Sequence, residues 1–132
     1  MTVDNDTCGA LFNEDTLDAL FPADRADQFF DALLGDADEG AYDIRLRFKE
    51  YKSNQLFFDM ELHQRPGKCL VCNLTYGLPN VFARHPIINV KGVVDEINKL
   101  MDGHGRCTGW TLGNTNEISR QLHVVPLVID IE

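Results

Sequence analysis

Long hydrophobic runs are absent from this sequence. No stretch of about 18 or more apolar residues occurs, so we expect no membrane-spanning helix. Residues 1–13 contain no basic group and no apolar core, which argues against a secretory signal peptide. Four cysteines without such a signal indicate free thiols in a reducing compartment. We therefore expect a cytoplasmic protein that does not bind a membrane.

The short motifs of catalysis are also absent. The chain has no glycine-rich phosphate loop, no nucleophile elbow and no His-Glu-x-x-His sequence. It also has no pair of carboxylates in an apolar setting at a spacing that would indicate general acid–base catalysis. These absences lower the expectation of an enzyme without excluding one. We predict no catalytic residue and no cofactor.

Basic residues are scarce in the first third of the chain. Residues 1–44 hold 12 acidic side chains and a single basic one, Arg25, whereas residues 45–132 hold nine acidic and 11 basic side chains. A nucleic-acid-binding surface has the opposite charge, so nucleic acid is not expected as a partner. Two interpretations remain: a solvated surface, or an acidic surface that meets a basic partner protein. For the second, the candidate binding residues are Asp24, Asp27 and Asp31.

The length and composition indicate one folded domain. The chain has 132 residues, of which 44% are hydrophobic, and this is enough to bury a core without disulfides. No internal repeat or linker divides it. We predict a flexible tail at residues 1–12 and a single α+β domain at residues 13–132.

Apolar residues at helical spacing predict three helices. Asn13 is a candidate N-cap for a short first helix, and Pro22 precedes a second helix that Gly35 ends. Asn89 is the candidate N-cap of a later helix at residues 90–101. The apolar face of the second helix comprises Ala26, Phe29, Phe30 and Leu33.

Alternation of polar and apolar residues predicts strands in the middle of the chain. Every second residue is apolar in three consecutive segments, as in a strand with one face in solvent. Short polar turns separate the segments, so we predict a three-stranded antiparallel meander. The strands are residues 42–49, 56–63 and 70–76, and the turns are residues 52–54 and 65–67.

Charge favours one register for the first two strands. If they form a hairpin, Arg45 and Arg47 lie opposite Glu61 and Asp59, or one step diagonal to them. Each such pair contributes only about 0.2–1 kcal/mol, but a slipped register would lose them all.

Two further strands are predicted near the end of the sequence, at residues 107–112 and 123–131, with a helical turn within residues 114–122. Pro126 cannot donate a backbone hydrogen bond, so it indicates an edge position for the last strand. The predicted order is ααβββαβ(α)β, an α+β fold with helices packed on one face of an antiparallel sheet. This order and the acidic composition resemble those of type III secretion chaperones. The resemblance implies a protein-binding function and a homodimer.

One set of residues has the chemistry of a metal site. Cys69, Cys72, His104 and Cys107 could supply four zinc ligands. However, Cys69 and Cys72 are three residues apart inside a predicted strand, and this spacing places their side chains on opposite faces. The interval from Cys72 to His104 also exceeds the roughly 15–20 residues of zinc ribbons. We therefore predict neither a metal site nor a redox pair.

A second candidate site lies in residues 77–89, which show no clear period. Phe82, Arg84 and His85 in this segment have the chemistry of a binding site, and long connections often carry function. Alternatively, the apolar residues of the segment cover one end of the core. We expect a non-catalytic protein-binding or adaptor module. The alternative is a small enzyme or ligand-binding protein with a site near Arg84, His85 and His104.

Overall fold

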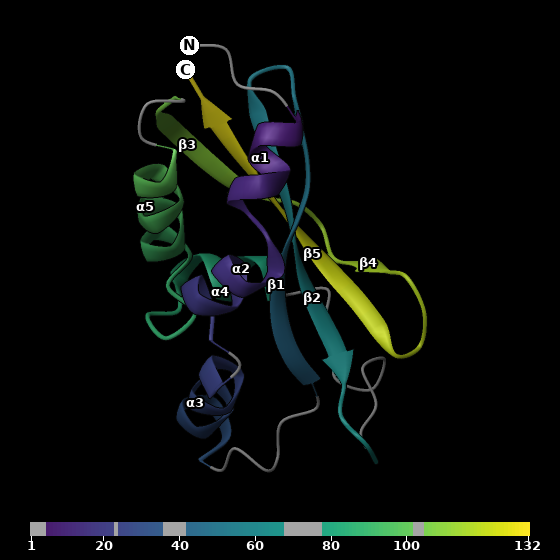
Figure 1. The fold of residues 1–132 in the computed structure, drawn as a ribbon. Helices are drawn as coiled ribbons and strands as arrows, with labels where there is room; N and C mark the ends of the chain where they lie inside the picture. The colour runs from purple at the N-terminus through teal and green to yellow at the C-terminus, as the bar shows by residue number, and fades with distance from the viewer. Residues whose placement is uncertain (1–4, 23, 36–41, 68–77, 102–104) are drawn as a thin grey trace.

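A computed structural model describes residues 5–22, 24–35, 42–67, 78–101 and 105–132 (Figure 1). It confirms an α+β fold in which helices pack against a mostly antiparallel sheet. Among these residues, no helix has the length and apolarity needed to cross a membrane. The elements are α1 (Asn5–Leu11), α2 (Glu14–Leu20), α3 (Asp24–Leu34), β1 (Tyr42–Lys52), β2 (Gln55–Gln64), α4 (Leu78–Arg84), α5 (Val90–Leu100), β3 (Cys107–Leu112), β4 (Asn116–Glu117) and β5 (Leu122–Ile131).

The hairpin of β1 and β2 has the register that charge predicted. Arg45 pairs with Glu61 and Arg47 with Asp59 across the two strands. The connecting residues Ser53 and Asn54 have φ angles of 53° and 61°, in the left-handed region that two-residue hairpin turns require. The predicted turn at residues 52–54 is therefore confirmed.

The central strand of the sheet is β5. The strand order is β1-β2-β5-β3, and the short β4 also pairs with β5. The edge position predicted from Pro126 is therefore wrong. In an antiparallel ladder the N–H and C=O of one residue point to the same neighbour. The Pro126 carbonyl accepts from Gly113 N–H at 2.8 Å, in the gap between β3 and β4, so the N–H that proline lacks would point into that gap.

The predicted third strand of the meander, at residues 70–76, lies outside the described residues. Its predicted place beside β2 is occupied by β5, which pairs with β2 from Gln55 to His63. Because β1 pairs with the other edge, β2 has a strand on both sides over this range. The sheet therefore joins the middle of the chain to a strand far along the sequence.

The segment predicted as a flexible tail contains α1 from Asn5 onward. Cys8 and Phe12 are buried in the core, with exposed fractions of 0% and 3%. The Phe12 ring packs edge-on against Phe58 of β2, at 5.2 Å between centroids. Residues 5–12 thus form part of the packed structure, because the apolar side chains of a single helical turn reach the sheet.

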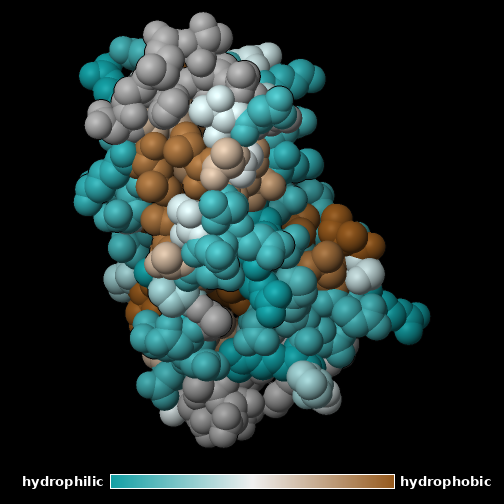
Figure 2. Space-filling model, viewed as in Figure 1, coloured by the Kyte–Doolittle hydropathy of each residue, from teal (hydrophilic) through white to brown (hydrophobic). Residues whose placement is uncertain are grey.

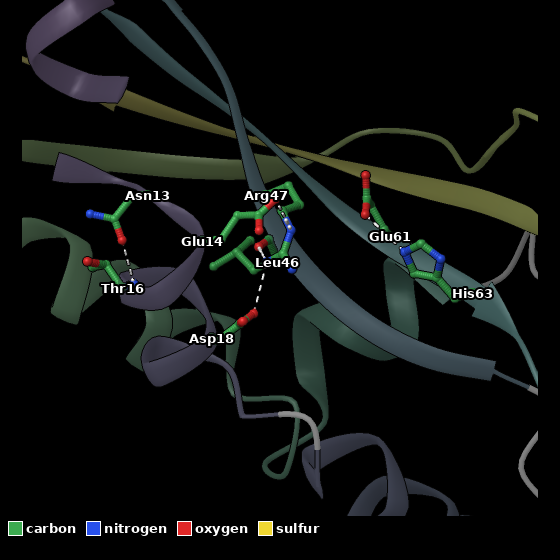
Figure 3. Close-up of polar contacts among 8 residues, drawn as sticks. All are labelled: Asn13, Glu14, Thr16, Asp18, Leu46, Arg47, Glu61 and His63. Carbon is green, nitrogen blue, oxygen red and sulfur yellow. Dashed lines mark hydrogen bonds and ion pairs between the residues drawn. The ribbon is translucent and has the colours of Figure 1, made fainter. Parts of the chain in front are cut away.

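Two arginines tie the acidic helices to β1, the edge strand that α1, α2 and α3 all contact. Figure 3 shows Arg47 reaching from β1 to α2, where it pairs with Asp18 at 2.9 Å and with Glu14 at 4.0 Å. Arg65, which follows β2, pairs with Asp27 of α3 at 2.7 Å and with Asp43 of β1 at 3.1 Å. These contacts and the helices protect a strand edge that would otherwise be free to pair with another chain.

A β-bulge in β1 lets two residues three apart face the core. The register shifts between Phe48 and Glu50, and Lys49 is the extra residue. Phe48 therefore pairs with Phe58, and Tyr51 with Leu56, on the same face of the sheet. Both side chains pack against the core, where Phe48 and Phe58 are 5.4 Å apart.

Two more predictions are corrected in the second half of the chain. Residues 77–89, predicted as an irregular connection, contain the helix α4. Residues 114–122, predicted to hold a helical turn, contain β4 and a turn in which Ile118 is 61% exposed.

Figure 2 shows an apolar projection near β4, and a second group of apolar side chains between α1 and α5.

Candidate functional site

A shallow hollow of about 360 Å³ lies at the end of α4. It is lined by Val81, Arg84, His85 and Pro86. Val81 is 38% exposed, which makes it one of two large apolar side chains that stand out from the described surface. The hollow therefore combines an apolar floor with the cation of Arg84 and the imidazole of His85.

His85 is held in place by two contacts. Its ring packs edge-on against Phe29 of α3, at 4.8 Å between centroids. Its Nδ1 accepts a hydrogen bond from the backbone N–H of Ile87 at 3.2 Å. The contact with Phe29 also places the hollow next to α3. Because one ring nitrogen is already engaged and the ring is packed against Phe29, His85 serves as a wall of the hollow.

The sequence predicted Arg84 and His85 together, and the structure places them in the same hollow. Phe82, the third predicted residue, has an exposed fraction of 0% and packs against Phe29 at 5.8 Å. It therefore belongs to the core. His104, which the alternative hypothesis adds to this site, lies outside the described residues.

The three predicted acidic residues, Asp24, Asp27 and Asp31, are all exposed on α3. Asp27 is engaged by Arg65, as described above. Asp24 and Asp31 are seven residues apart, so they lie on the same side of the helix, two turns apart. Within the described part of the chain, the ion pairs include neither of them.

Three of the four residues in the rejected metal quartet, Cys69, Cys72 and His104, lie outside the described residues. Only Cys107 is described, at the start of β3, and it is a free cysteine. Over the part of the chain that is described, no three potential ligands gather closely enough to hold a metal ion.

Sequence reasoning missed a second cavity, of about 260 Å³, between α5 and β3. Its walls include Asp95 on α5 and Cys107 and Trp110 on β3. Burial, and secondarily the negative charge of Asp95, raises the pKa of the Cys107 thiol to about 11. No short motif marks this cavity, because it forms between a helix face and a strand whose side-chain directions depend on a bulge.

Comparison of the chain with protein-family models, with curated proteins and with solved structures finds no match.

Proposed function

We propose that this protein is a non-catalytic protein-binding module that engages its partner at the α3–α4 surface. We define this surface as the hollow at Val81, Arg84, His85 and Pro86 together with the exposed side of α3. The observation that carries the proposal is the hollow itself, which has an apolar floor at the molecular surface. Apolar recesses of this kind accept the anchor side chains that contribute most of the binding free energy in protein complexes.

The acidic side chains of α3 indicate the chemistry of the partner. Asp24 and Asp31 are exposed on α3, on the side of the helix that faces away from Phe29 and its contact with His85. A partner that places an apolar anchor in the hollow and Lys or Arg side chains along α3 would match this arrangement. Arg84 at the rim adds donors for backbone carbonyls of the partner.

Binding is favoured over catalysis because the polar groups of the hollow are few and partly engaged. A general base needs a free nitrogen within hydrogen-bond reach of a substrate. In His85, Nδ1 already accepts from the backbone N–H of Ile87, and the ion pairs among the described residues do not include this ring. The hollow is also shallow, and at about 360 Å³ it lies near the lower limit of the roughly 300–1,000 Å³ found for small-molecule pockets.

The test is a comparative affinity capture from cells that naturally contain the protein, read by quantitative mass spectrometry. The baits are the wild type, Val81→Lys and Ile118→Lys. Ile118 is the matched control, since it is the other exposed large apolar side chain of the described surface. We expect a protein that the wild type and Ile118→Lys retain and that Val81→Lys loses. Equal capture by all three baits, or no protein enriched by any, would contradict the proposal.

A further inference from the structure

The cavity between α5 and β3 has a lining distinct from the α3–α4 surface. It is bordered by side chains of both charges and by apolar walls. The lining includes Lys91, Val94, Asp95 and Asn98 from α5, and Cys107 and Trp110 from β3. At about 260 Å³ it is smaller than the pockets that hold drug-sized molecules, so an occupant must be smaller still.

The polar wall follows from the sequence of α5. Lys91, Asp95 and Asn98 are spaced by four and three residues, so they form one stripe along the helix. The opposite stripe, Val90, Val93 and Ile97, is buried in the core. Burial of that apolar stripe fixes the rotation of α5, and the polar stripe is thereby held against the edge of β3.

The opposite wall depends on a β-bulge. Cys107 and Trp110 are three residues apart, a spacing that would put them on opposite faces of a regular strand. The register shifts between Cys107 and Gly109, so Cys107 pairs with Ile131 and Trp110 with Ile129, on the core side of the sheet. Bulges commonly redirect side chains in this way beside functional sites. The bulge therefore turns both the thiol and the indole toward α5.

A hydrogen bond sets the relative position of the two walls. Asn98 Oδ1 accepts from the backbone N–H of Cys107 at 2.8 Å. From this point α5 and β3 run in opposite directions (Figure 1). Lys91 lies about 10 Å back along the helix, and Trp110 about 10 Å along the strand, so the two border the same end of the cavity. Asp95 lies between Lys91 and Asn98 on the helix stripe.

Among the described residues, the ion pairs include neither of the two charges of this cavity. Lys91 and Asp95 form no ion pair with each other, whereas Lys99 and Glu96 on the outer side of the same helix pair at 3.0 Å. The raised pKa of Cys107 keeps its thiol neutral at physiological pH. A neutral thiol is neither a nucleophile nor a metal ligand, so Cys107 contributes a weakly polar wall.

We propose that this cavity binds a small zwitterion, namely a free amino acid with an apolar side chain. Its carboxylate lies against the Lys91 ammonium and its ammonium against the Asp95 carboxylate. Its side chain packs between Val94, Cys107 and the Trp110 indole. Both charges of the lining then acquire a charge-assisted hydrogen bond, and its apolar side chains contact an apolar group.

The test is calorimetric titration of the intact protein with leucine, valine and phenylalanine up to millimolar concentration. Two further probes separate the charges of leucine: isoamylamine retains its amine, and isocaproate retains its carboxylate. We expect at least one amino acid to bind, and each half-ligand to bind about tenfold more weakly or worse, as the loss of one charge-assisted hydrogen bond implies. Failure of all three amino acids to bind would overturn the proposal, and so would an amine that binds as tightly as leucine.

Variants locate the binding. Lys91→Met should weaken the amino acid about tenfold but leave the affinity for isoamylamine unreduced, because only the carboxylate contact is lost. Asp95→Asn should show the opposite preference. Lys99→Met and Glu96→Gln are matched controls on the same helix, and they should leave the affinity unchanged. Binding that is indifferent to Lys91→Met and Asp95→Asn would place the ligand elsewhere and overturn the proposal.

Discussion

Phe58 of β2 offers the sharpest test of the sheet. Its side chain is 1% exposed and packs against the rings of Phe12 and Phe48, at 5.2 and 5.4 Å between centroids. Phe58→Ala removes the buried ring and leaves a cavity, which in other proteins costs about 3–5 kcal/mol. Because two edge-on ring contacts are lost as well, each worth about 0.5–1.5 kcal/mol, we expect a value near the upper end of that range.

The neighbouring Phe57 is the matched control. It faces the other side of the sheet, between Glu50 and Val128, and is only partly buried. Phe57→Ala should lower the free energy of unfolding by about 1–2 kcal/mol, since partial burial gives a smaller transfer term and no closed cavity. Urea titration followed by the fluorescence of Trp110, the single tryptophan, measures both. Equal losses at the two positions would refute the assigned faces of β2.

Two further predictions concern α5 and β3. The pKa of Cys107 is raised from 9.0 to about 11, so alkylation of this thiol should be slow at pH 9.0 in the folded protein. Asp95→Asn should accelerate the alkylation and Glu96→Gln should not, and peptide mass spectrometry measures the rate. Because the pKa is higher in the folded state, the stability that Cys107 contributes is present below about pH 9 and is lost as the pH rises through about 11. Asn89 caps α5 from a left-handed backbone conformation, with φ of 50°, and accepts from Gly92 N–H at 3.2 Å. Asn89→Ala should therefore lower the free energy of unfolding by about 1–2 kcal/mol and Asn89→Gly by only a few tenths, whereas equal losses would contradict the cap.

The sequence was sufficient to predict those features of the fold that depend on residues close together along the chain. Alternation and charge predicted the β1–β2 register, and the caps Asn13 and Asn89 both accept the backbone hydrogen bond expected of them. The Gly35 position after α3 also has the left-handed φ, 82°, that ends many helices. These features were predictable because each is decided within a few residues along the chain.

Long-range pairing was not predictable in the same way. Pro126 was a sound indicator of a missing hydrogen bond, but the missing bond lies in a gap between β3 and β4 rather than at a sheet edge. The two bulges could not be predicted from the alternation of polar and apolar residues either. The bulge after Phe48 and the bulge after Cys107 each bring residues three apart onto one face, where a regular strand would separate them. A spacing of three therefore does not by itself separate side chains in this sheet.

The candidate site was only partly predictable. Arg84 and His85 were found because their residue types suit recognition, and they line one hollow. Phe82 was assigned to the same site, yet helix α4 turns it inward, and this helix was not visible in the hydrophobic pattern. The cavity beside Cys107 needed the packing of α5 on β3, which only the folded chain supplies.

The central position of β5 has a consequence for how the protein is made. A ribosome synthesises the chain from the N-terminus to the C-terminus, and β5 follows all the other described elements. Until β5 emerges, β2 lacks a partner on one edge, and both β3 and β4 lack the strand with which they pair. The nascent chain thus carries an open edge from the completion of β2 until β5 emerges, which is a route to aggregation. Shortening the chain within β5 removes the centre of the sheet, so such fragments should accumulate as aggregates and not as trimmed native protein.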